Sequence, residues 1–121
     1  YPKRDYTYVE DTAEAFYQVI ISRQKTLGKV LNIGSGYDIS MNDLLIKISK
    51  IMNIKFKLKS SKIHKRPSKS EVDHLLANSK MAKRLIKWSP KYSGRNGFSR
   101  GLQKTIDWNI NNKSQLNDTI F

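Results

Sequence analysis

Gly34-Ser35-Gly36 is the first place in this sequence where cofactor chemistry has to be considered, because it follows the β-prone segment 29–33. A dinucleotide-binding loop of the form Gly-x-Gly-x-x-Gly would require a third glycine at position 39, and Ile39 stands there. It would also need an acidic residue about 20 residues beyond the strand to bind the ribose, and the stretch after Ile51 offers none. We therefore interpret the glycines as a tight turn that needs a positive φ.

The residue patterns of proton transfer and metal binding are also missing from the sequence. In a Tyr-x-x-x-Lys pair the lysine lowers the pKa of the tyrosine, but none of the six tyrosines is followed by lysine at the fourth position. His64 and His74 have only Glu71 and Asp73 nearby, which matches no metalloprotease spacing. No cysteine is present to form a disulfide or a thiolate metal site. The sequence thus predicts neither a catalytic dyad nor a metal centre.

Two arginines are the best candidates for binding an anion. Arg4 precedes an expected strand, and Arg66 stands before Pro67 in a loop that cannot be regular. An arginine fork makes bidentate contacts to phosphate oxygens and stays charged at any working pH. Two such forks from separate loops could clamp a diphosphate. On spacing alone, an ordinary surface position for both arginines is an open alternative.

The formal net charge is +13, and residues 44–70 contain many basic residues and no acidic one. Such a field attracts phosphates, nucleic acid or acidic membranes. Its lysines also alternate with Ile54, Phe56 and Leu58, as on the solvated side of a half-exposed strand. A basic nucleic-acid-binding module is therefore one alternative function, although Phe56 is the only aromatic residue there for base stacking. A scaffold remnant that binds no ligand is another.

Hydrophobic periodicity and capping residues indicate an α/β chain. The helical spacing predicts helices at residues 12–22, 79–86 and 98–111. A further helix should open at Ser40-Met41-Asn42-Asp43, with its apolar residues from Leu44 to Met52 facing inward. The β-prone segments are residues 6–9, 29–33 and 54–58, and residues 59–73 are predicted to be a basic loop. Asp11 is the expected N-cap of the first helix, and Ser40 forms a near capping box with Asp43 in the second. The third should stop before Trp88-Ser89-Pro90, because the residue before a proline avoids helical space.

The length and composition allow one domain. With 121 residues, 38% of them hydrophobic and 10% aromatic, the chain can bury a core. No run of about 18 apolar residues is present, so we expect no membrane span and no membrane partner. The absence of cysteine fits the reducing cytoplasm, where we expect the protein to be located. The chain starts without an initiator methionine or an apolar signal region, which favours a fragment or a processed piece.

Four blocks of the sequence occur in the order found in the extended short-chain dehydrogenase/reductases that act on nucleotide sugars. The blocks are Arg4-Asp5-Tyr6-Thr7-Tyr8-Val9-Glu10-Asp11, Val30-Leu31-Asn32-Ile33-Gly34-Ser35-Gly36, Arg66-Pro67, and Lys83-Arg84-Leu85-Ile86-Lys87-Trp88-Ser89-Pro90 with Gly101 to Trp108 behind it. The chain resembles this NAD-dependent epimerase/dehydratase family. Residues 66–72 and 92–98 are most similar to UDP-N-acetylglucosamine 4,6-dehydratases. Two positions depart from the family pattern, since Asn78 replaces an acid and Lys87 replaces the glycine usual at a helix end.

The resemblance implies an α/β fold, the C-terminal part of an extended short-chain dehydrogenase/reductase. It would contain the last strands of the Rossmann sheet and a small α/β substrate-binding domain. Residues 1–112 would form this substrate-binding portion and residues 113–121 a tail. NAD would be bound by an N-terminal domain outside this chain. The whole enzyme, a homodimer, would act on a nucleotide sugar, in particular a UDP-linked one, and would bind neither nucleic acid nor membranes.

The resemblance also implies substrate contacts for particular residues. Arg4 and Arg66 would contact the nucleotide diphosphate. Glu71 would accept a hydrogen bond from a ribose hydroxyl, and Asn32 would lie near the sugar nucleotide at the domain junction. The intact enzyme would oxidise the sugar at C4, eliminate water across C5 and C6 and return the hydride, or else epimerise the sugar. No residue of this chain would carry out chemistry, and the chain alone would be inactive.

Overall fold

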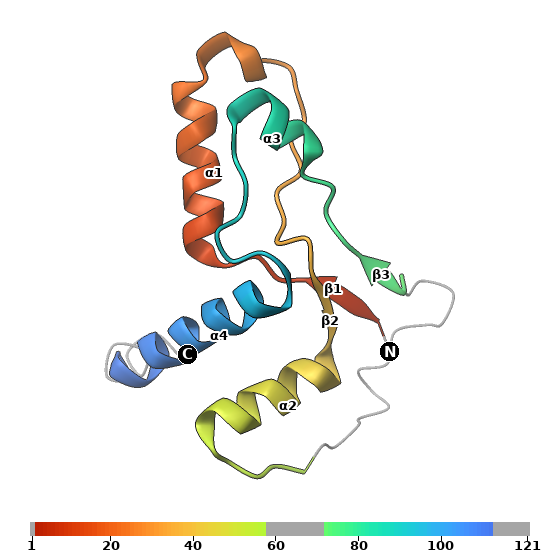
Figure 1. The fold of residues 1–121 in the computed structure, drawn as a ribbon, viewed down its shortest axis with the longest axis vertical. Helices are drawn as coiled ribbons and strands as arrows, with labels where there is room; N and C mark the ends of the chain where they lie inside the picture. Colours follow the sequence, from red (N-terminus) through yellow and green to blue (C-terminus); the bar gives the residue numbers. More distant parts are fainter. Residues whose placement is uncertain (1, 58–71, 113–121) are drawn as a thin grey trace, which may run out of the picture.

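The computed structural model of the chain describes residues 2–57 and 72–112, which form short strands and helices (Figure 1). The strands are β1 (Lys3–Asp5), β2 (Asp38–Ser40) and β3 (His74–Leu75). The helices are α1 (Val9–Ile21), the 3-10 helix η1 (Arg23–Thr26), α2 (Met41–Met52), α3 (Lys80–Ile86) and α4 (Gly94–Asn111). The fold is therefore mixed α/β, as the sequence predicts. The predicted tail and most of the predicted basic loop lie outside the described residues.

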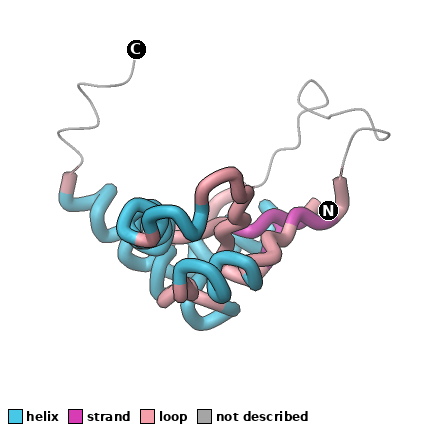
Figure 2. Tube along the Cα trace, turned by 90° about the horizontal axis from the view of Figure 1, so that it is seen from above, coloured by secondary structure: helices cyan, strands magenta, loops and turns pink. Residues whose placement is uncertain are grey.

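A small mixed sheet joins segments that are far apart in the sequence. Strand β1 lies in the middle, antiparallel to β2 and parallel to β3, in the order β2-β1-β3. Lys3 is opposite Ser40 on one side and His74 on the other, and its amide donates to the Asp73 carbonyl at 2.7 Å. Figure 2 shows the strands at one edge of the molecule, with helices making up most of the rest. The sheet thereby fixes the start of the chain beside both partner segments.

Helix α1 begins at Val9, so the predicted strand at residues 6–9 is wrong. Pairing with β2 ends before this segment, and Tyr8 serves as the N-cap with φ −68° and ψ 141°. Asp11 is not the N-cap that the sequence predicts, since it lies inside the first turn of the helix and is only 2% exposed. Its carboxylate points inward because main-chain amides from a distant segment bind it there.

Two further predicted strands are not strands in the described residues. Residues 29–33 have no neighbouring strand in the sheet, and a strand needs a partner for its main-chain hydrogen bonds. Residues 54–57 follow the end of α2, where Asn53 is left-handed (φ 52°) and the Ile54 amide donates to the Ser49 carbonyl at 3.0 Å. This is the long-range bond of a Schellman motif, which turns the chain out of the helix. Position 58 lies outside the described residues.

The ends of α2 and α3 follow local signals in the sequence. The Ser40 hydroxyl accepts a hydrogen bond from the Asp43 amide at 3.1 Å, which confirms the predicted cap of α2. Helix α3 stops at Ile86, before the Trp88-Ser89-Pro90 segment, as predicted. Its C-cap, Lys87, has φ 57°, the left-handed conformation that glycine adopts most readily.

Helix α4 starts at Gly94, one turn before the predicted start at residue 98. Two glycines in this first turn weaken the helical signal in the sequence, because glycine disfavours a helix interior. Gly97 is needed for packing, since a Cβ at this position would lie 2.3 Å from the carbonyl carbon of Tyr92. Because the segment around Tyr92 lies so close to the helix, only glycine fits at position 97.

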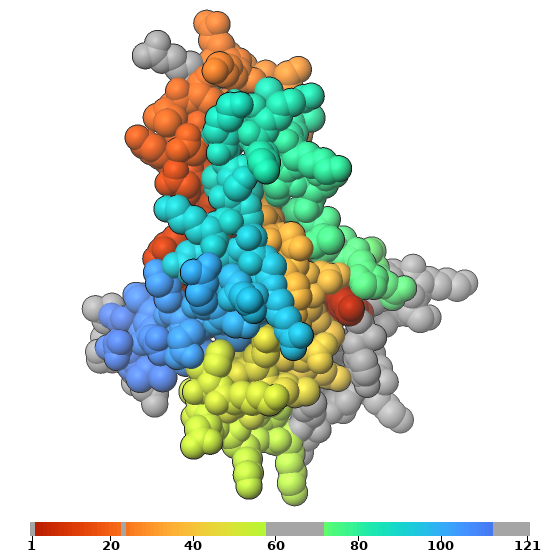
Figure 3. Space-filling view, in the orientation of Figure 1, coloured from red at the N-terminus to blue at the C-terminus, as the bar shows by residue number. Residues whose placement is uncertain are grey.

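The main core lies between α1 and α3. Its fully buried members are Ala15, Ala82, Ile86 and Trp88, with Val19, Leu31, Ile33 and Leu85 packed against them. Helix α1 contributes Ala15 to this cluster and α3 contributes Ala82 and Ile86. Figure 3 shows the chain leaving α3 and running along α1 toward α4, which ties this core to the other helices. None of the described helices is both long enough and apolar enough to cross a membrane.

Candidate functional site

Asp5, at the end of β1, joins the glycine turn to the chain that follows β3. Its Oδ1 accepts hydrogen bonds from the Ser35 amide at 2.9 Å and the Ser35 hydroxyl at 2.6 Å. Its Oδ2 accepts from the amides of Gly36 at 3.2 Å and Ala77 at 3.4 Å. Gly34 is required here, because a Cβ would lie 2.3 Å from the Ala77 Cβ and 2.6 Å from Asp5 Oδ2. Asp5 is therefore a structural anchor between two segments.

The glycine turn does not fit the pyrophosphate of NAD. In a dinucleotide-binding loop the main-chain amides must be available to phosphate oxygens, whereas the amides of Ser35 and Gly36 donate to the Asp5 carboxylate. A carboxylate at this position would also repel a phosphate. Gly36 has φ 71°, which confirms the predicted tight turn. The described residues of this turn therefore form a structural corner rather than a cofactor site.

Arg4 lies in the central strand, and its guanidinium is fixed beside the sheet. Its Nη1 donates to the Val72 carbonyl at 2.8 Å and to the Lys3 carbonyl at 2.9 Å. Val72 directly follows the segment that carries Arg66 and Glu71, and both of these residues lie outside the described part of the chain. The convergence of Arg4 with Arg66 and Glu71 therefore stays a prediction.

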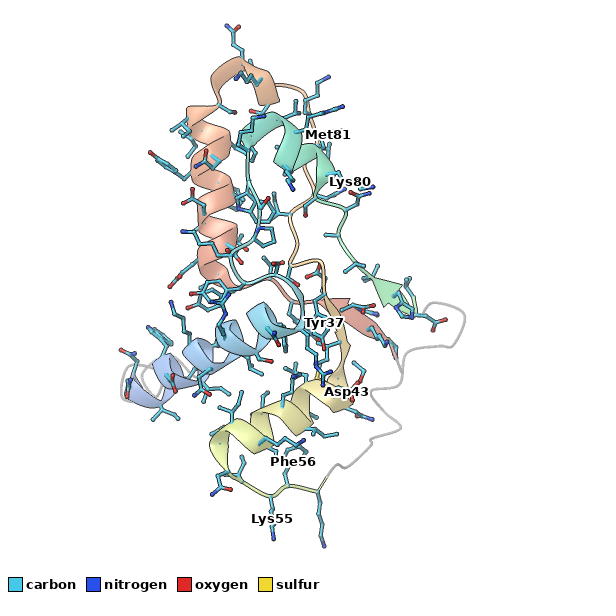
Figure 4. All side chains as sticks on the ribbon, viewed as in Figure 1. Tyr37, Asp43, Lys55, Phe56, Lys80 and Met81 are labelled. Atoms are coloured by element: carbon cyan, nitrogen blue, oxygen red, sulfur yellow. The ribbon has the colours of Figure 1, made fainter. Side chains whose placement is uncertain are left out.

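Asn32 lines a hollow of about 390 Å³ beside α3, and Arg4 is not among the residues around this hollow. The other polar side chains there belong to Asn78, Lys80 and Arg84. Figure 4 shows Lys80, with Met81, near the start of α3. The described residues thus do not bring Arg4 and Asn32 into one cavity. The two basic residues of α3 match no binding motif in the sequence, although their spacing of four places them on one helix face.

A second hollow, of about 290 Å³, lies between Asp5, Ile33 and residues 75–77. Like the hollow around Asn32, it is lined by residues that precede the glycine turn and by residues between β3 and α3. The two hollows are lined by different residues of these two segments.

Asp11 anchors the segment that leaves α3. Its Oδ1 accepts from the Lys91 amide at 2.8 Å, and its Oδ2 accepts from the Tyr92 amide at 3.0 Å. Its main-chain carbonyl accepts from the Trp88 indole Nε1 at 3.0 Å. A buried carboxylate needs such donors, because burial without them is costly. The sequence blocks that contain Asp11 and Trp88 therefore have a structural role.

A tyrosine and a lysine do meet in space, although not at Tyr-x-x-x-Lys spacing. The ring centroids of Tyr8 and Tyr92 are 4.5 Å apart, and the Lys104 ammonium is 5.3 Å from the Tyr92 centroid. The Glu10 carboxylate accepts from the Tyr8 hydroxyl at 3.3 Å and lies 3.4 Å from Lys104 Nζ. Loss of hydration and the Glu10 carboxylate raise the pKa of Tyr8, and the hydrogen bond with Tyr92 raises the pKa of Lys104. A tyrosine that abstracts a proton needs a lowered pKa, so the surroundings of Tyr8 act in the opposite direction.

His74 pairs with Asp38 across the sheet, with 2.7 Å between Nδ1 and Oδ2. Within residues 2–57 and 72–112, no three His, Cys, Asp or Glu side chains are grouped so that they could hold a metal ion. His64 lies outside the described residues. In the described part of the chain, the polar partner of His74 is therefore the carboxylate of Asp38.

Residues 1–101 match the profile of the family described as GDP-mannose 4,6 dehydratase. The chain belongs to this family. The UDP-glucuronate 4-epimerase of Thermodesulfobacterium geofontis (strain OPF15) is 30% identical over 111 residues, which cover 90% of this chain and 31% of the epimerase. The trifunctional UDP-glucose 4,6-dehydratase/UDP-4-keto-6-deoxy-D-glucose 3,5-epimerase/UDP-4-keto-L-rhamnose-reductase of Arabidopsis thaliana is 31% identical over 115 residues. These cover 95% of this chain and 16% of that protein.

The crystal structure of UDP-glucuronic acid 4-epimerase from Bacillus cereus in complex with NAD shares the fold over 84% of this chain. The TM-score is 0.58, the sequence identity is 23%, and the match covers 29% of that epimerase chain. Our chain thus spans about a third of the length of both epimerases. These findings confirm the resemblance to NAD-dependent epimerases and dehydratases. They give no support to a nucleic-acid-binding module, and the similarity to UDP-N-acetylglucosamine 4,6-dehydratases stays a prediction.

The two departures from the pattern of this epimerase/dehydratase family have different consequences. The Asn78 Oδ1 accepts a hydrogen bond from the Lys80 amide at 3.1 Å, so this side chain supports the first turn of α3 as a carboxylate would. Asn78 also lines the same hollow as Asn32, so the first departure falls near a predicted substrate contact. Lys87 keeps the left-handed conformation without the glycine that adopts it freely.

Proposed function

We propose that this chain is the nucleotide-sugar-binding part of an NAD-dependent sugar-nucleotide epimerase or 4,6-dehydratase, and that the nucleotide is UDP. Membership of the family supports sugar-nucleotide chemistry. The names of both relatives contain UDP-linked sugars, which favours UDP over other nucleotides. In this proposal the chain grips the nucleotide, while residues outside positions 1–121 bind NAD and transfer protons.

The observation that carries the proposal is the fixed position of Arg4 in the central strand. Its hydrogen bond holds the guanidinium at the carbonyl of Val72, the residue that follows Glu71 in the sequence. A side chain that is already held in place loses less rotamer freedom when it binds a ligand. A guanidinium matches phosphate oxygens in pairs, which suits the diphosphate contact proposed for Arg4.

The proposed role of this chain in the reaction is to position the sugar. The diphosphate and the ribose do not react, so their binding energy can be used to hold the sugar ring against the cofactor. Arg4 and Arg66 would supply the diphosphate contacts, and Glu71 would accept from the ribose. Asn32, which lines the hollow beside α3, would lie near the sugar nucleotide at the junction with the NAD-binding domain.

Two features support the assignment of the chemistry to other residues. The amides of the glycine turn are occupied by Asp5, and the pKa of Tyr8 is raised rather than lowered by its surroundings. The cofactor and the proton-transfer residues would then come from a further layer of the enzyme. NAD, when bound in that layer, would supply the hydride chemistry at the sugar.

The test is a calorimetric titration with UDP-glucose, UDP and duplex DNA at two salt concentrations. We expect saturable UDP binding, weakened about tenfold by Arg4→Met, because one charge-assisted hydrogen bond is lost. The matched control is Arg100→Met, since Arg100 also donates to a main-chain carbonyl, that of Lys91, at 3.0 Å. Equal weakening by both substitutions would contradict the role of Arg4. Preferential, strongly salt-dependent binding of DNA would contradict the proposal as a whole.

A further inference from the structure

A hollow of about 530 Å³ opens between β1, the segment that includes β2, helix α2 and the first turn of α4. Its walls carry basic side chains from three different elements, namely Lys3, Lys47, Lys50 and Arg95. The two lysines of α2 are three residues apart, so they lie on the same face of the helix. The tertiary structure therefore gathers cations that the sequence distributes over more than 90 positions.

These cations have few partners of opposite charge. The Lys47 ammonium donates to the neutral Ser99 hydroxyl at 3.2 Å. In residues 2–57 and 72–112, no carboxylate forms an ion pair with Lys3, Lys50 or Arg95. Lys3 and Lys47 are also half-buried, which reduces their access to water. Like charges that share a partly dehydrated hollow repel one another, and a bound anion would relieve this repulsion.

The two carboxylates in the lining already have other partners. The Asp38 Oδ2 lies 2.7 Å from His74 Nδ1, and the Asp43 Oδ2 accepts from the Ser40 hydroxyl at 2.6 Å. Figure 4 shows Asp43 at the start of α2 and Tyr37 beside the start of α4, at the level where the two helices approach the sheet. The hollow as a whole therefore keeps an excess of positive charge.

We infer that this hollow binds a small molecule that carries phosphate. A phosphate group offers several oxygens that can accept from ammonium and guanidinium donors at the same time. The volume of the hollow lies in the range of ligand pockets, roughly 300–1,000 Å³. The Tyr37 ring, held 5.4 Å from the Phe98 ring between centroids, provides an aromatic wall for the rest of the molecule. An anionic site with one aromatic side suits a sugar phosphate or a nucleotide.

This site is separate from the one proposed around Arg4. Lys3 and Arg4 are neighbours in β1, and neighbouring side chains of a strand point to opposite faces. Arg4 is not among the residues that line the hollow. The inference therefore does not depend on the proposed function, and either can fail without the other.

The test is a titration of the full chain with inorganic pyrophosphate, followed by calorimetry and by the amide resonances of nitrogen-15-labelled protein. We expect saturable binding, with the largest resonance shifts at residues 37–39, 46–50 and 95. The double substitution Lys47→Gln/Lys50→Gln should weaken binding at least about tenfold, because charge-assisted contacts are lost. Arg95→Gln should weaken it less and should leave the fold unchanged, since this side chain is exposed.

The matched control is Lys25→Gln/Lys29→Gln, which changes the net charge equally at the end of the molecule that holds η1, far from α2 (Figure 1). Pyrophosphate affinity should be unchanged in this control. Equal weakening by the control, resonance shifts centred on other residues, or a failure to saturate would each overturn the inference. Glucose 1-phosphate and UMP, titrated next, share the phosphate and differ in the attached group. The tighter of the two identifies whether the phosphate comes from a sugar or a nucleotide.

Discussion

Helix α1 has two apolar faces, and only one of them is covered by the described part of the chain. On the inner face, Ala15 packs against Ala82 and Trp88 and is almost fully buried. On the outer face, Phe16 is 68% exposed and Ile20 is 74% exposed. A helix at the surface of a finished domain normally has polar residues on its outer side. Helix α1 therefore has the residue pattern of a helix that packs against protein on both sides.

The bare surface extends beyond the helix itself. Leu27 and Val30 are also largely exposed, and the segment that contains Val30 has no strand partner in the described residues. Monomeric proteins rarely leave such apolar surface uncovered. The inner face of α1 therefore holds the described part of the chain together, whereas its outer face is suited to contact with a further layer of protein. This agrees with the proposed division of work, in which NAD is bound by residues beyond this chain.

The largest expected effect is on the inner side, at the carboxylate that anchors the chain after α3. Asp11→Ala should lower the free energy of unfolding by about 3 kcal/mol, because the main-chain amides of Lys91 and Tyr92 lose their acceptor. Urea denaturation followed by circular dichroism measures this change. Asp107→Ala, an exposed position on α4, is the control and should have little effect. Equal losses would mean that the anchor is not important for the fold.

The next effect tests how tightly the inner face is packed. Ala82→Leu should lower the free energy of unfolding by about 2 kcal/mol, since Ala82 has no exposed surface and the added carbons must displace neighbours. Met81→Leu, one position earlier and partly exposed, should change stability little. The same denaturation experiment compares the two. A tolerated Ala82→Leu would show that α1 and α3 can move apart at low cost.

A smaller effect, which should stabilise the protein, is expected at the end of α3. Lys87→Gly should raise the free energy of unfolding by about 1 kcal/mol, because glycine adopts the left-handed φ without the strain of a Cβ. Lys83→Gly, inside the same helix, removes the same charge and should instead lower stability by about 1 kcal/mol. Opposite signs support the conformational explanation, and a loss of stability at position 87 would contradict it.

The smallest effect on stability, but not on association, is expected on the outer face. Phe16→Ser/Ile20→Ser should change the free energy of unfolding by less than about 1 kcal/mol, because both side chains are already exposed. It should reduce self-association in sedimentation velocity experiments, since apolar surface is removed. The control, Gln103→Ser/Asn109→Ser on the exposed side of α4, should leave association unchanged. A large loss of stability would show that the outer face is not bare.

Features that depend on neighbouring residues could be predicted from the amino-acid sequence alone. The cap of α2 by Ser40 and the end of α3 before Pro90 each follow from side chains a few residues away. The same is true of the family blocks, which identify the chain without any knowledge of contacts. Arg4 and Asn32 were also selected from these blocks, but the blocks do not reveal that Arg4 is missing from the hollow around Asn32.

The roles of the buried carboxylates and of the β-prone segments became apparent only from the folded chain. Asp11 looks like a helix cap in the sequence, yet its amide partners lie 80 and 81 residues further along the chain. Asp5 likewise binds amides 30 and 72 residues away. Residues 29–33 have β propensity, but propensity forms a strand only where another strand supplies hydrogen bonds. These outcomes depend on which distant groups the fold brings together, and no local pattern contains that information.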